Sequence, residues 1–349
     1  SLPGSALIPA PYGERLASSF KAGRQIVDLV NKGIDARQVI TKESMRNAIK
    51  VMMAICGSTN AVLHLAAIAN EADLDMNVVE EFRELNKVTP QIAKVNPAAK
   101  WDMEDFYKAG GIPRVMTRLG NLLDPSCLTC TGKTVKANLE GFHYQYPDNP
   151  EIIKTVEAPF SKTGGIAVLQ GNLAPHTAIS KPGAIDPKLH RFTGKAKCFN
   201  SEEEAEEAIL GGKIKEGDVV VIRYEGPKGG PGMREMFKAM KYMYGVGLAK
   251  KAALITDGRF SGTNNGCFVG HISPEAAEGG PIAIVEDGDE ISIDVIEGKL
   301  TLHVSDEEIK KRFASWKRPH KDIPKGYLRL YSKVASSADK GAIIADEEV

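Results

Sequence analysis

The stretch Asp218–Met236, "DVVVIRYEGPKGGPGMREM", decides how the second half of the chain is interpreted. Its first residues are β-branched and apolar, which predicts a buried strand that ends at Glu225. Glycines then let the backbone turn closely, and a helix is expected to follow with free N–H groups that could face an anion. A strand-end carboxylate is also a suitable ligand for Mg²⁺. Taken alone the turn is a weak signal, because its ordinary meaning is a loop with unusual backbone angles, and it lacks the GxGxxG spacing of a dinucleotide site.

Similar short apolar runs fill the chain after about residue 150, among them "GGIAVLQGNLA", "AALITDG" and "IAIVEDGDEISIDVIEGKLTLHV". The two runs that flank Asp287-Gly288-Asp289 predict a hairpin with an Asp-Gly turn. Residues 12–120 instead carry helical spacing. The first expected helix stops at Gly33 and has the apolar residues Leu16, Phe20, Ile26, Val27 and Val30, and it is followed by a helix capped by Thr41 and further helices after Cys56 and around Gly110-Gly111. The sequence therefore predicts an α/β (α+β) protein, a helical or α/β portion followed by a barrel-like β-domain, with the boundary near 140–160.

A second strand-end loop, "TDGRFSGTNNG" (Thr256–Gly266), brings Asp257, Arg259, Ser261 and Thr263 into one glycine-containing turn. Loops at strand ends commonly carry binding and catalytic residues. The spacing is not that of the nucleophile elbow of α/β-hydrolases, and a plain Ser-Gly turn is the competing interpretation. The nearby His271 is interpreted as a core histidine whose hydrogen bonds are satisfied, and Glu275 as an acid at the start of a helix.

Length and charge narrow the class of protein. The chain has 349 residues, which at about 150 residues per domain predicts two domains. Its 45 basic and 45 acidic residues balance, so neither nucleic acid nor an anionic membrane is an expected partner. Five scattered cysteines argue against a disulfide scaffold and for a reducing compartment, the cytoplasm or an organelle stroma or matrix. The start has neither Met nor a signal-peptide pattern, so we interpret the sequence as a fragment or a processed chain.

The cysteines form no recognisable metal motif by themselves. Cys56, in "MAICGSTN", stands between an apolar run and a polar turn, and is either a small buried apolar residue or a ligand with distant partners. The segment "CLTCTGKT" (Cys127–Thr134) resembles half of a zinc site or the end of a phosphate-binding loop. No second cysteine pair follows for zinc, and the phosphate-binding loop needs a glycine at Cys127 and a preceding β-run. Two cysteines in a turn are the preferred interpretation there.

Taken in order, eight blocks resemble the dihydroxy-acid dehydratase and sugar-acid dehydratase family. They are "SLPGSALIPA", "CGSTNAVLHLAAIA", "GGIPRVM", "CLTCTGKT", "TGGIAVLQGNLAP", "RYEGPKGGPGMREM", "TDGRFSGTNNGCFVGHISPEAAEGGPIA" and "YSKVASSADKGA". The resemblance runs from the first residue nearly to the last. It implies that residues 1–150 are the C-terminal portion of the family's N-terminal α/β domain, on the cluster side. Residues 151–349 would be its barrel-like C-terminal domain with the Mg²⁺ and base loops.

The resemblance also implies cofactors and site residues. Family members hold an iron–sulfur cluster, 2Fe-2S or in some members 4Fe-4S, and a Mg²⁺ ion, and we expect the 2Fe-2S type here. Cys56 matches the third cluster cysteine, Glu225 the Mg²⁺-binding glutamate of the C-terminal domain, and Ser261 the serine proposed as general base. Thr263 could bind substrate beside Ser261. The other cluster cysteines and Mg²⁺ ligands lie upstream of this chain in the family.

The expected activity is dehydration of a 2,3-dihydroxy carboxylic acid to a 2-keto acid, of the kind used in branched-chain amino-acid biosynthesis. Hydroxide is a poor leaving group, so the reaction needs a Lewis acid as well as a base at C2. Two alternatives stay open: a sugar-acid (aldonate or phosphogluconate) dehydratase, and a non-catalytic fragment or subunit without the N-terminal cluster ligands. His176-Thr177 and Asn264-Asn265 depart from the branched-chain pattern. The expected partners are the dihydroxy acid, the N-terminal part of the same protein and a second copy in a homodimer.

Overall fold

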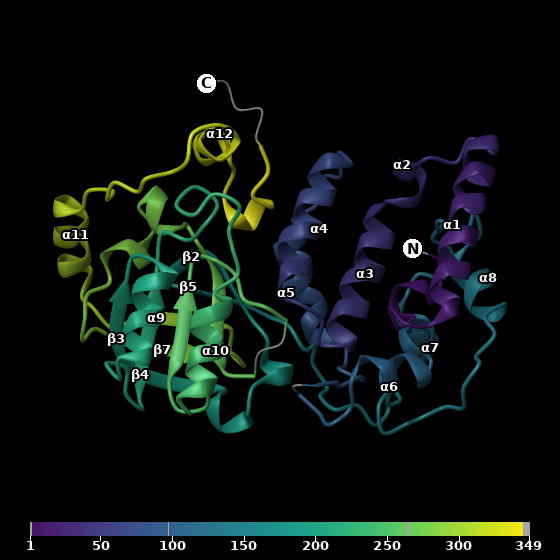
Figure 1. The fold of residues 1–349 in the computed structure, drawn as a ribbon, viewed down its shortest axis with the longest axis horizontal. Coiled ribbons are helices and arrows are strands. Elements are labelled where there is room, and N and C mark those ends of the chain that lie inside the picture. Colours follow the sequence, from purple (N-terminus) through teal and green to yellow (C-terminus); the bar gives the residue numbers. More distant parts are fainter. Residues whose placement is uncertain (1, 97, 263–264, 345–349) are drawn as a thin grey trace. The chain divides into compact units, whose positions relative to one another are not determined.

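The computed structural model describes residues 2–96, 98–262 and 265–344. It divides into two compact units, shown in Figure 1. The first unit comprises Ser1–Gly57 and Ile68–Gly165, and the second Ser58–Ala67 and Ile166–Val349. One helix, α4 (Asn60–Glu71), is divided between them.

The regular structure of the first unit is helical. Its helices are α1 (Gly13–Asn31), α2 (Ala36–Val39), α3 (Lys42–Ala54), α5 (Val78–Val88), α6 (Met103–Lys108), α7 (Gly111–Leu119) and α8 (Val135–Glu140). The expected cap of α3 is confirmed, because the Thr41 hydroxyl accepts a hydrogen bond from the Ser44 N–H. The pair of helices expected around Gly110-Gly111 is also confirmed, since Gly110 adopts a left-handed conformation between α6 and α7. Among the described residues, none of the helices combines the length and the apolar composition needed to cross a bilayer.

The second unit contains the expected barrel. Eight strands close in the order β1-β2-β6-β5-β4-β3-β7-β8. They are β1 (Ala167–Gly171), β2 (Ala174–Ser180), β3 (Arg191–Phe199), β4 (Asp218–Ile222), β5 (Ala253–Thr256), β6 (Cys267–Ser273), β7 (Glu290–Asp294) and β8 (Lys299–Leu302). The neighbours β3, β4, β5 and β6 run parallel, and the other pairs are antiparallel except β1 with β8. The parallel quartet therefore presents its carboxyl ends at one edge.

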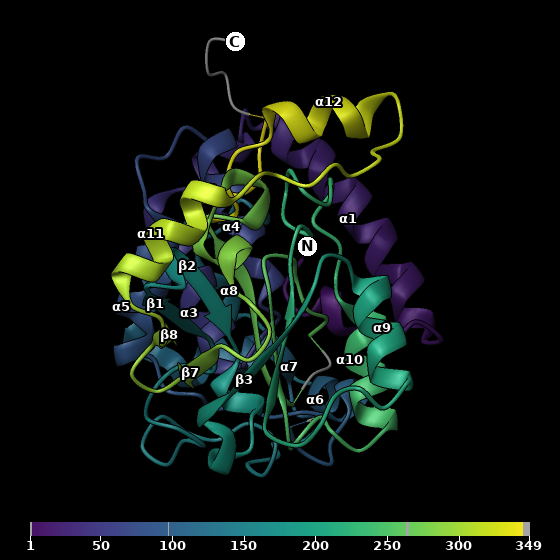
Figure 2. The ribbon, with the colours of Figure 1, turned by 90° about the vertical axis from the view of Figure 1, so that its left-hand side faces the viewer.

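Burial on both faces explains why the residues of β4 after Asp218 are all apolar. Val219 and Val221 pack with residues of the other strands in the barrel interior. Val220 and Ile222 point the opposite way, into a second core formed with α9 (Glu202–Leu210) and α10 (Phe237–Gly245). Figures 1 and 2 show these two helices side by side against the strands. A strand buried on both faces needs a continuous apolar run, which "VVVI" supplies.

One expectation about elements is wrong, and a second is confirmed with a later start. The run before the Asp-Gly turn is a 3-10 helix (Pro281–Ile284) and not a strand, because a proline begins it and its side chains enter the barrel core. The turn contacts β3, where the Asp287 carboxylate accepts a hydrogen bond from Cys198 N–H, and the hairpin of this region joins β7 to β8 instead.

The helix after the Gly-rich turn begins only at Phe237. Its Lys238 and Ala239 N–H groups donate to the Glu202 carboxylate of the same chain, so the expected anion is an internal one.

Candidate active site at the ends of the parallel strands

Four loops meet where the parallel strands end. The segment after β3 begins α9, Glu225 follows β4, Asp257 directly follows β5, and Glu275 follows β6. The paired ends of β3, β4 and β5 lie in register, with Phe199 opposite Ile222 and Ile222 opposite Thr256. Ligand sites in sheets with parallel strands commonly lie beyond these carboxyl ends. The second unit therefore presents Glu225 and Asp257, the start of the loop that carries Ser261, at one strand-end edge.

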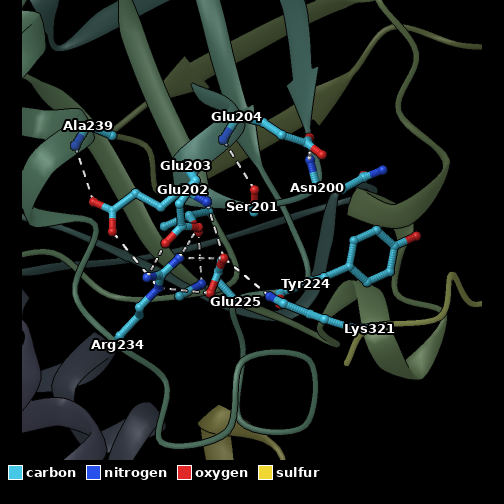
Figure 3. A network of polar contacts seen from close by, with 12 residues as sticks. Asn200, Ser201, Glu202, Glu203, Glu204, Tyr224, Glu225, Arg234, Ala239 and Lys321 are labelled. Carbon is cyan, nitrogen blue, oxygen red and sulfur yellow. Dashed lines mark hydrogen bonds and ion pairs between the residues drawn. The ribbon is translucent and has the colours of Figure 1, made fainter. Parts of the chain in front are cut away.

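Glu225 is buried, with 1% of its surface exposed, at the centre of the polar network in Figure 3. Its Oε1 accepts hydrogen bonds from the Glu202 N–H (3.2 Å) and from Arg234 Nη2 (3.1 Å). Its Oε2 accepts from Arg234 Nε at 3.2 Å. Lys321 Nζ adds an ion pair with Oε1 at 3.3 Å. Two cations and a helix N-terminus thus hold the carboxylate in place.

Arg234 connects Glu225 to a second, more exposed carboxylate. Its Nη1 and Nη2 donate to the two oxygens of Glu203 at 2.7 and 2.6 Å, the paired geometry of a strong arginine–carboxylate contact. These hydrogen bonds lower the pKa of Glu203 to about 2. Arg234 and Lys321 did not emerge from the sequence. Arg234 stands inside the Gly-rich turn and could have been found there, whereas Lys321 lies in a distant loop without a pattern.

Two buried carboxylates fasten the loops to one another. Asp257 accepts hydrogen bonds from the N–H groups of Tyr224 (3.0 Å), Glu225 (2.9 Å) and Ala276 (2.9 Å). Glu275 accepts from the N–H groups of Lys228 and Gly229, in the Gly-rich turn. Burial raises the pKa of Asp257 to about 6 and the pKa of Glu275 to about 8. Glu275 is interpreted from the sequence as an acid at the start of a helix, but in the structure its hydrogen bonds fix the turn that follows Glu225.

Ser261 lies half-buried in the loop after β5, and Thr263 lies outside the described residues. The loop contacts a residue that sequence reasoning missed. Lys181, only 8% exposed at the end of β2, donates from Nζ to the Gly262 carbonyl at 3.0 Å. A buried ammonium group that contacts the residue after Ser261 favours negative charge on nearby oxygens. No motif marks Lys181, so only the fold brings it to this loop.

A cavity of about 610 Å³ adjoins the Glu225 turn within the second unit. Tyr224 and Gly229 form part of its wall, and Arg318, His320 and Lys321 form another part. The last three residues come from the loop between α11 (Asp306–Ser315) and α12 (Tyr327–Val334). Its cationic wall suits a carboxylate or another small anion.

Cys56 lies in the first unit, directly after the C-cap of α3. It is 7% exposed and has a positive φ of 51°, an unusual conformation for a residue with a side chain. Its thiol donates to the Gly165 carbonyl at 3.4 Å. A Cβ on Gly165 would come within 2.8 Å of the Cys56 sulfur, so a glycine is needed for the two chains to approach. The turn therefore holds the thiol in one defined position.

Glu225 and Cys56, the two residues matched to metal ligands of the family, each offer a donor atom suited to the expected metal. The space beside Glu225 Oε2 is kept open by Gly230, whose added Cβ would lie 2.7 Å from that oxygen, and a carboxylate oxygen suits Mg²⁺. The thiol of Cys56 suits iron. Within residues 2–96, 98–262 and 265–344 there is no group of three or more His, Cys, Asp or Glu side chains that could hold a metal ion. Glu225 and Cys56 thus fit their expected roles as individual ligands, and neither forms a complete site.

Comparison with known proteins identifies the family of the chain. The family model described as "Dihydroxy-acid/6-phosphogluconate dehydratase C-terminal" matches residues 151–342, and the corresponding N-terminal model matches residues 1–138. The chain belongs to the dihydroxy-acid/6-phosphogluconate dehydratase family. The C-terminal model covers the strand-end loops of the barrel, and the N-terminal model covers the turn of Cys56.

Several dehydratases of this family have similar sequences. Proteins named dihydroxy-acid dehydratase from Caldanaerobacter subterraneus subsp. tengcongensis and Acetivibrio thermocellus are 50% identical over 347 and 348 residues. That from Thermodesulfovibrio yellowstonii is 50% identical over 344 residues. Each alignment covers 99% of this chain and 62% of the relative. The chain therefore spans about three fifths of the length of these dehydratases.

Proposed function

We propose that this chain forms part of a hydro-lyase that converts a 2,3-dihydroxy carboxylic acid into a 2-keto acid and water. The observation that carries the proposal is the single strand-end edge of the barrel, where Glu225 and the Ser261 loop are tied together through Asp257. The name dihydroxy-acid dehydratase, borne by relatives with 50% identity, supports the same reaction. A role in branched-chain amino-acid biosynthesis is part of the proposal.

Ser261 is proposed as the base that removes the proton from C2 of the substrate. The C3 hydroxyl then leaves as water, and the resulting enol tautomerises to the keto acid. A serine is a weak base unless its alkoxide is stabilised. Lys181 supports the assignment, because its ammonium group contacts the carbonyl of the next residue and lowers the energy of negative charge in the loop. Thr263 is proposed to bind the substrate together with Ser261.

Glu225 is proposed as a Mg²⁺ ligand and Cys56 as an iron–sulfur ligand, with a 2Fe-2S cluster preferred over 4Fe-4S. When bound, these groups would supply Lewis acidity for the leaving hydroxyl and positive charge for the substrate carboxylate. The remaining ligands would come from sequence outside these 349 residues. In this assignment residues 1–150 form the cluster-side domain, and residues 151–349 the domain with the Mg²⁺ and base loops.

Ser261→Ala, made in a longer form of the protein that contains the remaining ligands, tests the base assignment. We expect loss of turnover by at least about a hundredfold with an unchanged cluster absorption spectrum, since Ser261 is not a ligand. Near-normal turnover would exclude Ser261 as the base. Glu225→Gln should instead weaken Mg²⁺ activation, because a neutral amide oxygen is a poorer ligand for a hard cation.

A second candidate is a sugar-acid dehydratase acting on an aldonate or phosphogluconate. It is favoured by two polar residues beside β6, His176 in β2, whose side chain is 53% exposed, and Asn265 in the base loop. Comparing turnover of 2,3-dihydroxyisovalerate with that of aldonates separates the two. A clear preference for aldonates would overturn the first choice.

A third possibility, a non-catalytic subunit, is distinguished by the same assay in the longer protein. No turnover of either substrate class with a full complement of metal would favour it. The proposed partners are the small dihydroxy acid, the N-terminal part of the same protein, and a second copy in a homodimer.

A further inference from the structure

Two cations contact the Glu225 carboxylate, and they differ in the other carboxylates that they contact (Figure 3). Arg234 donates to Glu203 at 2.7 and 2.6 Å, which is closer than its contacts of 3.1 and 3.2 Å with Glu225. Lys321 Nζ pairs with Glu225 Oε1 at 3.3 Å, and among the described residues this is its one ion pair. The charge of Arg234 is therefore balanced by Glu203, whereas that of Lys321 is balanced by Glu225 alone.

The two side chains also differ in how firmly their backbone is held. Arg234 lies in the Gly-rich turn, and its carbonyl accepts a hydrogen bond from the Arg259 N–H at 3.2 Å. Lys321 lies in the loop of residues 316–326, between α11 and α12. Within the described part of the chain, residues 317–325 of this loop make no hydrogen bond between backbone groups. Segments of this kind are displaced at a low cost in free energy, so Lys321 is the cation that can move.

The cavity of about 610 Å³ beside the Glu225 turn offers space for that movement. Lys321 itself lines the cavity, and its side chain is already 36% exposed. Arg318 and His320 lie on the same wall, and Glu204 lines the cavity as well. An ammonium group that leaves Glu225 can therefore be solvated in the cavity and attracted by the Glu204 carboxylate.

We propose that Lys321 is the exchangeable counter-cation of Glu225, and that binding of Mg²⁺ to this carboxylate displaces the Lys321 ammonium group into the cavity. The inference rests on the proposed role of Glu225 as a Mg²⁺ ligand and adds a residue that competes with the ion. Gly230 leaves room beside Glu225 Oε2, and Lys321 contacts Oε1 of the same carboxyl group. A divalent cation bound to that group repels the ammonium group.

The exchange gives Lys321 a role both before and after the ion binds. Glu225 is 1% exposed, and a buried carboxylate without a partner is strongly destabilising. Lys321 helps to balance this charge until Mg²⁺ replaces it. Because each cation weakens the binding of the other, Lys321 also lowers the affinity of Glu225 for Mg²⁺.

Lys321→Met, made in a longer form of the protein that contains the remaining ligands, tests the competition. Loss of the ammonium group should lower the dissociation constant for Mg²⁺ by at least about fivefold, measured by isothermal titration calorimetry on protein purified without Mg²⁺. Lys228→Met is the matched control, because Lys228 lies in the Gly-rich turn but pairs with Glu278 at 2.6 Å. It should change the constant by less than about twofold. An unchanged or higher constant in Lys321→Met, or an equal decrease in both variants, overturns the proposal.

Chemical labelling of lysines tests the displacement directly. A brief treatment with acetic anhydride, followed by peptide mass spectrometry, measures the reactivity of each amine. Saturating Mg²⁺ should raise the reactivity of Lys321 at least about twofold, because its ammonium group leaves the carboxylate. Lys251, which pairs with Glu216 in the same unit, should react equally with and without Mg²⁺. Unchanged or lower reactivity of Lys321 in the presence of Mg²⁺ overturns the proposal.

Glu225→Gln separates this inference from the proposed function. If Mg²⁺ binds equally well to Glu225→Gln and to the parent, the role of Glu225 as a ligand fails and the exchange fails with it. If Glu225→Gln weakens Mg²⁺ binding while Lys321→Met leaves it unchanged, the ligand role stands and only the exchange is overturned.

Discussion

At the level of single residues, the position of the Glu225 backbone and carboxylate depends on the absence of a side chain at Gly230. A Cβ at that position would lie 2.7 Å from Glu225 Oε2 and 2.9 Å from its Cα. Because one of these atoms belongs to the backbone, Gly230→Ala must displace the turn as well as the carboxylate. We expect the free energy of unfolding, measured in urea, to fall by about 1–3 kcal/mol.

The matched control for this change is Gly245→Ala at the end of α10. An added Cβ there meets nothing within 4 Å. The variant should be as stable as the parent or more stable by up to about 1 kcal/mol, because alanine is the better helix former. Equal destabilisation by both substitutions would contradict the close approach at Gly230.

His271 should make the free energy of unfolding depend on pH, and a substitution at this residue can measure its contribution. It is 2% exposed, has a φ of 55°, and its Nε2 is buried with no hydrogen-bond partner among the described residues. The sequence had suggested a core histidine with satisfied hydrogen bonds, and only the first part is confirmed. Burial, with smaller effects of Arg259 and His64, lowers the pKa of His271 to about 3.

The unfolded state therefore binds a proton at His271 between about pH 6.5 and pH 3, whereas the folded state does not. Stability is complete above this window and falls as the pH falls through it. Between about pH 7.5 and pH 5 the parent should lose about 2 kcal/mol more than His271→Asn, which cannot titrate and tolerates a positive φ. Urea unfolding at the two pH values measures the difference. Parallel losses in both proteins would show that His271 does not carry this dependence.

Local motifs located the loops that carry Glu225 and Ser261, whereas the roles of these two residues stay predictions. Glu225 and Ser261 stand at strand ends, and a strand end can be located from an apolar run cut by glycine or aspartate. Lys181 and Lys321 could not be found in this way. Lys181 contacts Gly262 only because the barrel closes, and Lys321 contacts Glu225 from a loop far along the chain. Partners separated by long stretches of chain leave no spacing to detect.

At the level of elements, Glu202 joins two helices. It lies in the first turn of α9, and its Oε1 accepts hydrogen bonds from Lys238 N–H (2.9 Å) and Ala239 N–H (3.2 Å) of α10. Glu202→Ala leaves these two buried N–H groups without their acceptor, so the free energy of unfolding should fall by about 2 kcal/mol. Glu207→Ala, an exposed change in the same helix, should shift it by less than about 0.5 kcal/mol. Chemical denaturation of both variants checks this, and indistinguishable midpoints would contradict the role of Glu202.

Helices and strands could be predicted from local sequence, whereas the pairing between them could not. The α9 cap by Ser201 is local, because the Glu204 N–H donates to the hydroxyl of a residue three positions earlier. The hairpin around Asp287-Gly288 failed because an Asp-Gly pair fixes a turn without fixing which strands it joins. Asp287 contacts β3, an element almost ninety positions earlier in the sequence. Helical spacing likewise located α1 but could not reveal which side of it would be buried.

At the level of the whole molecule, the ligands of the proposed cofactors are divided between the two units, with Cys56 in the first and Glu225 in the second. The described residues contain no cluster of three metal-ligating side chains. A cluster held by one thiolate is not retained, since iron–sulfur centres are held by several cysteines. The 349-residue chain purified without oxygen should therefore contain iron and sulfide at well below one cluster per chain and show no visible absorption band.

A longer form that contains the remaining ligands should hold about one cluster per chain, and Cys56→Ser in that form should lower its iron content severalfold. Cys267→Ser is the matched control, because Cys267 is a fully buried residue of β6 in the barrel core. Its substitution can lower stability but should not change the iron bound per folded chain. A stoichiometric cluster in the 349-residue chain, or equal iron in the Cys56→Ser variant and its parent, would remove Cys56 from the cluster. Glu225 would then have to be judged on Mg²⁺ binding alone.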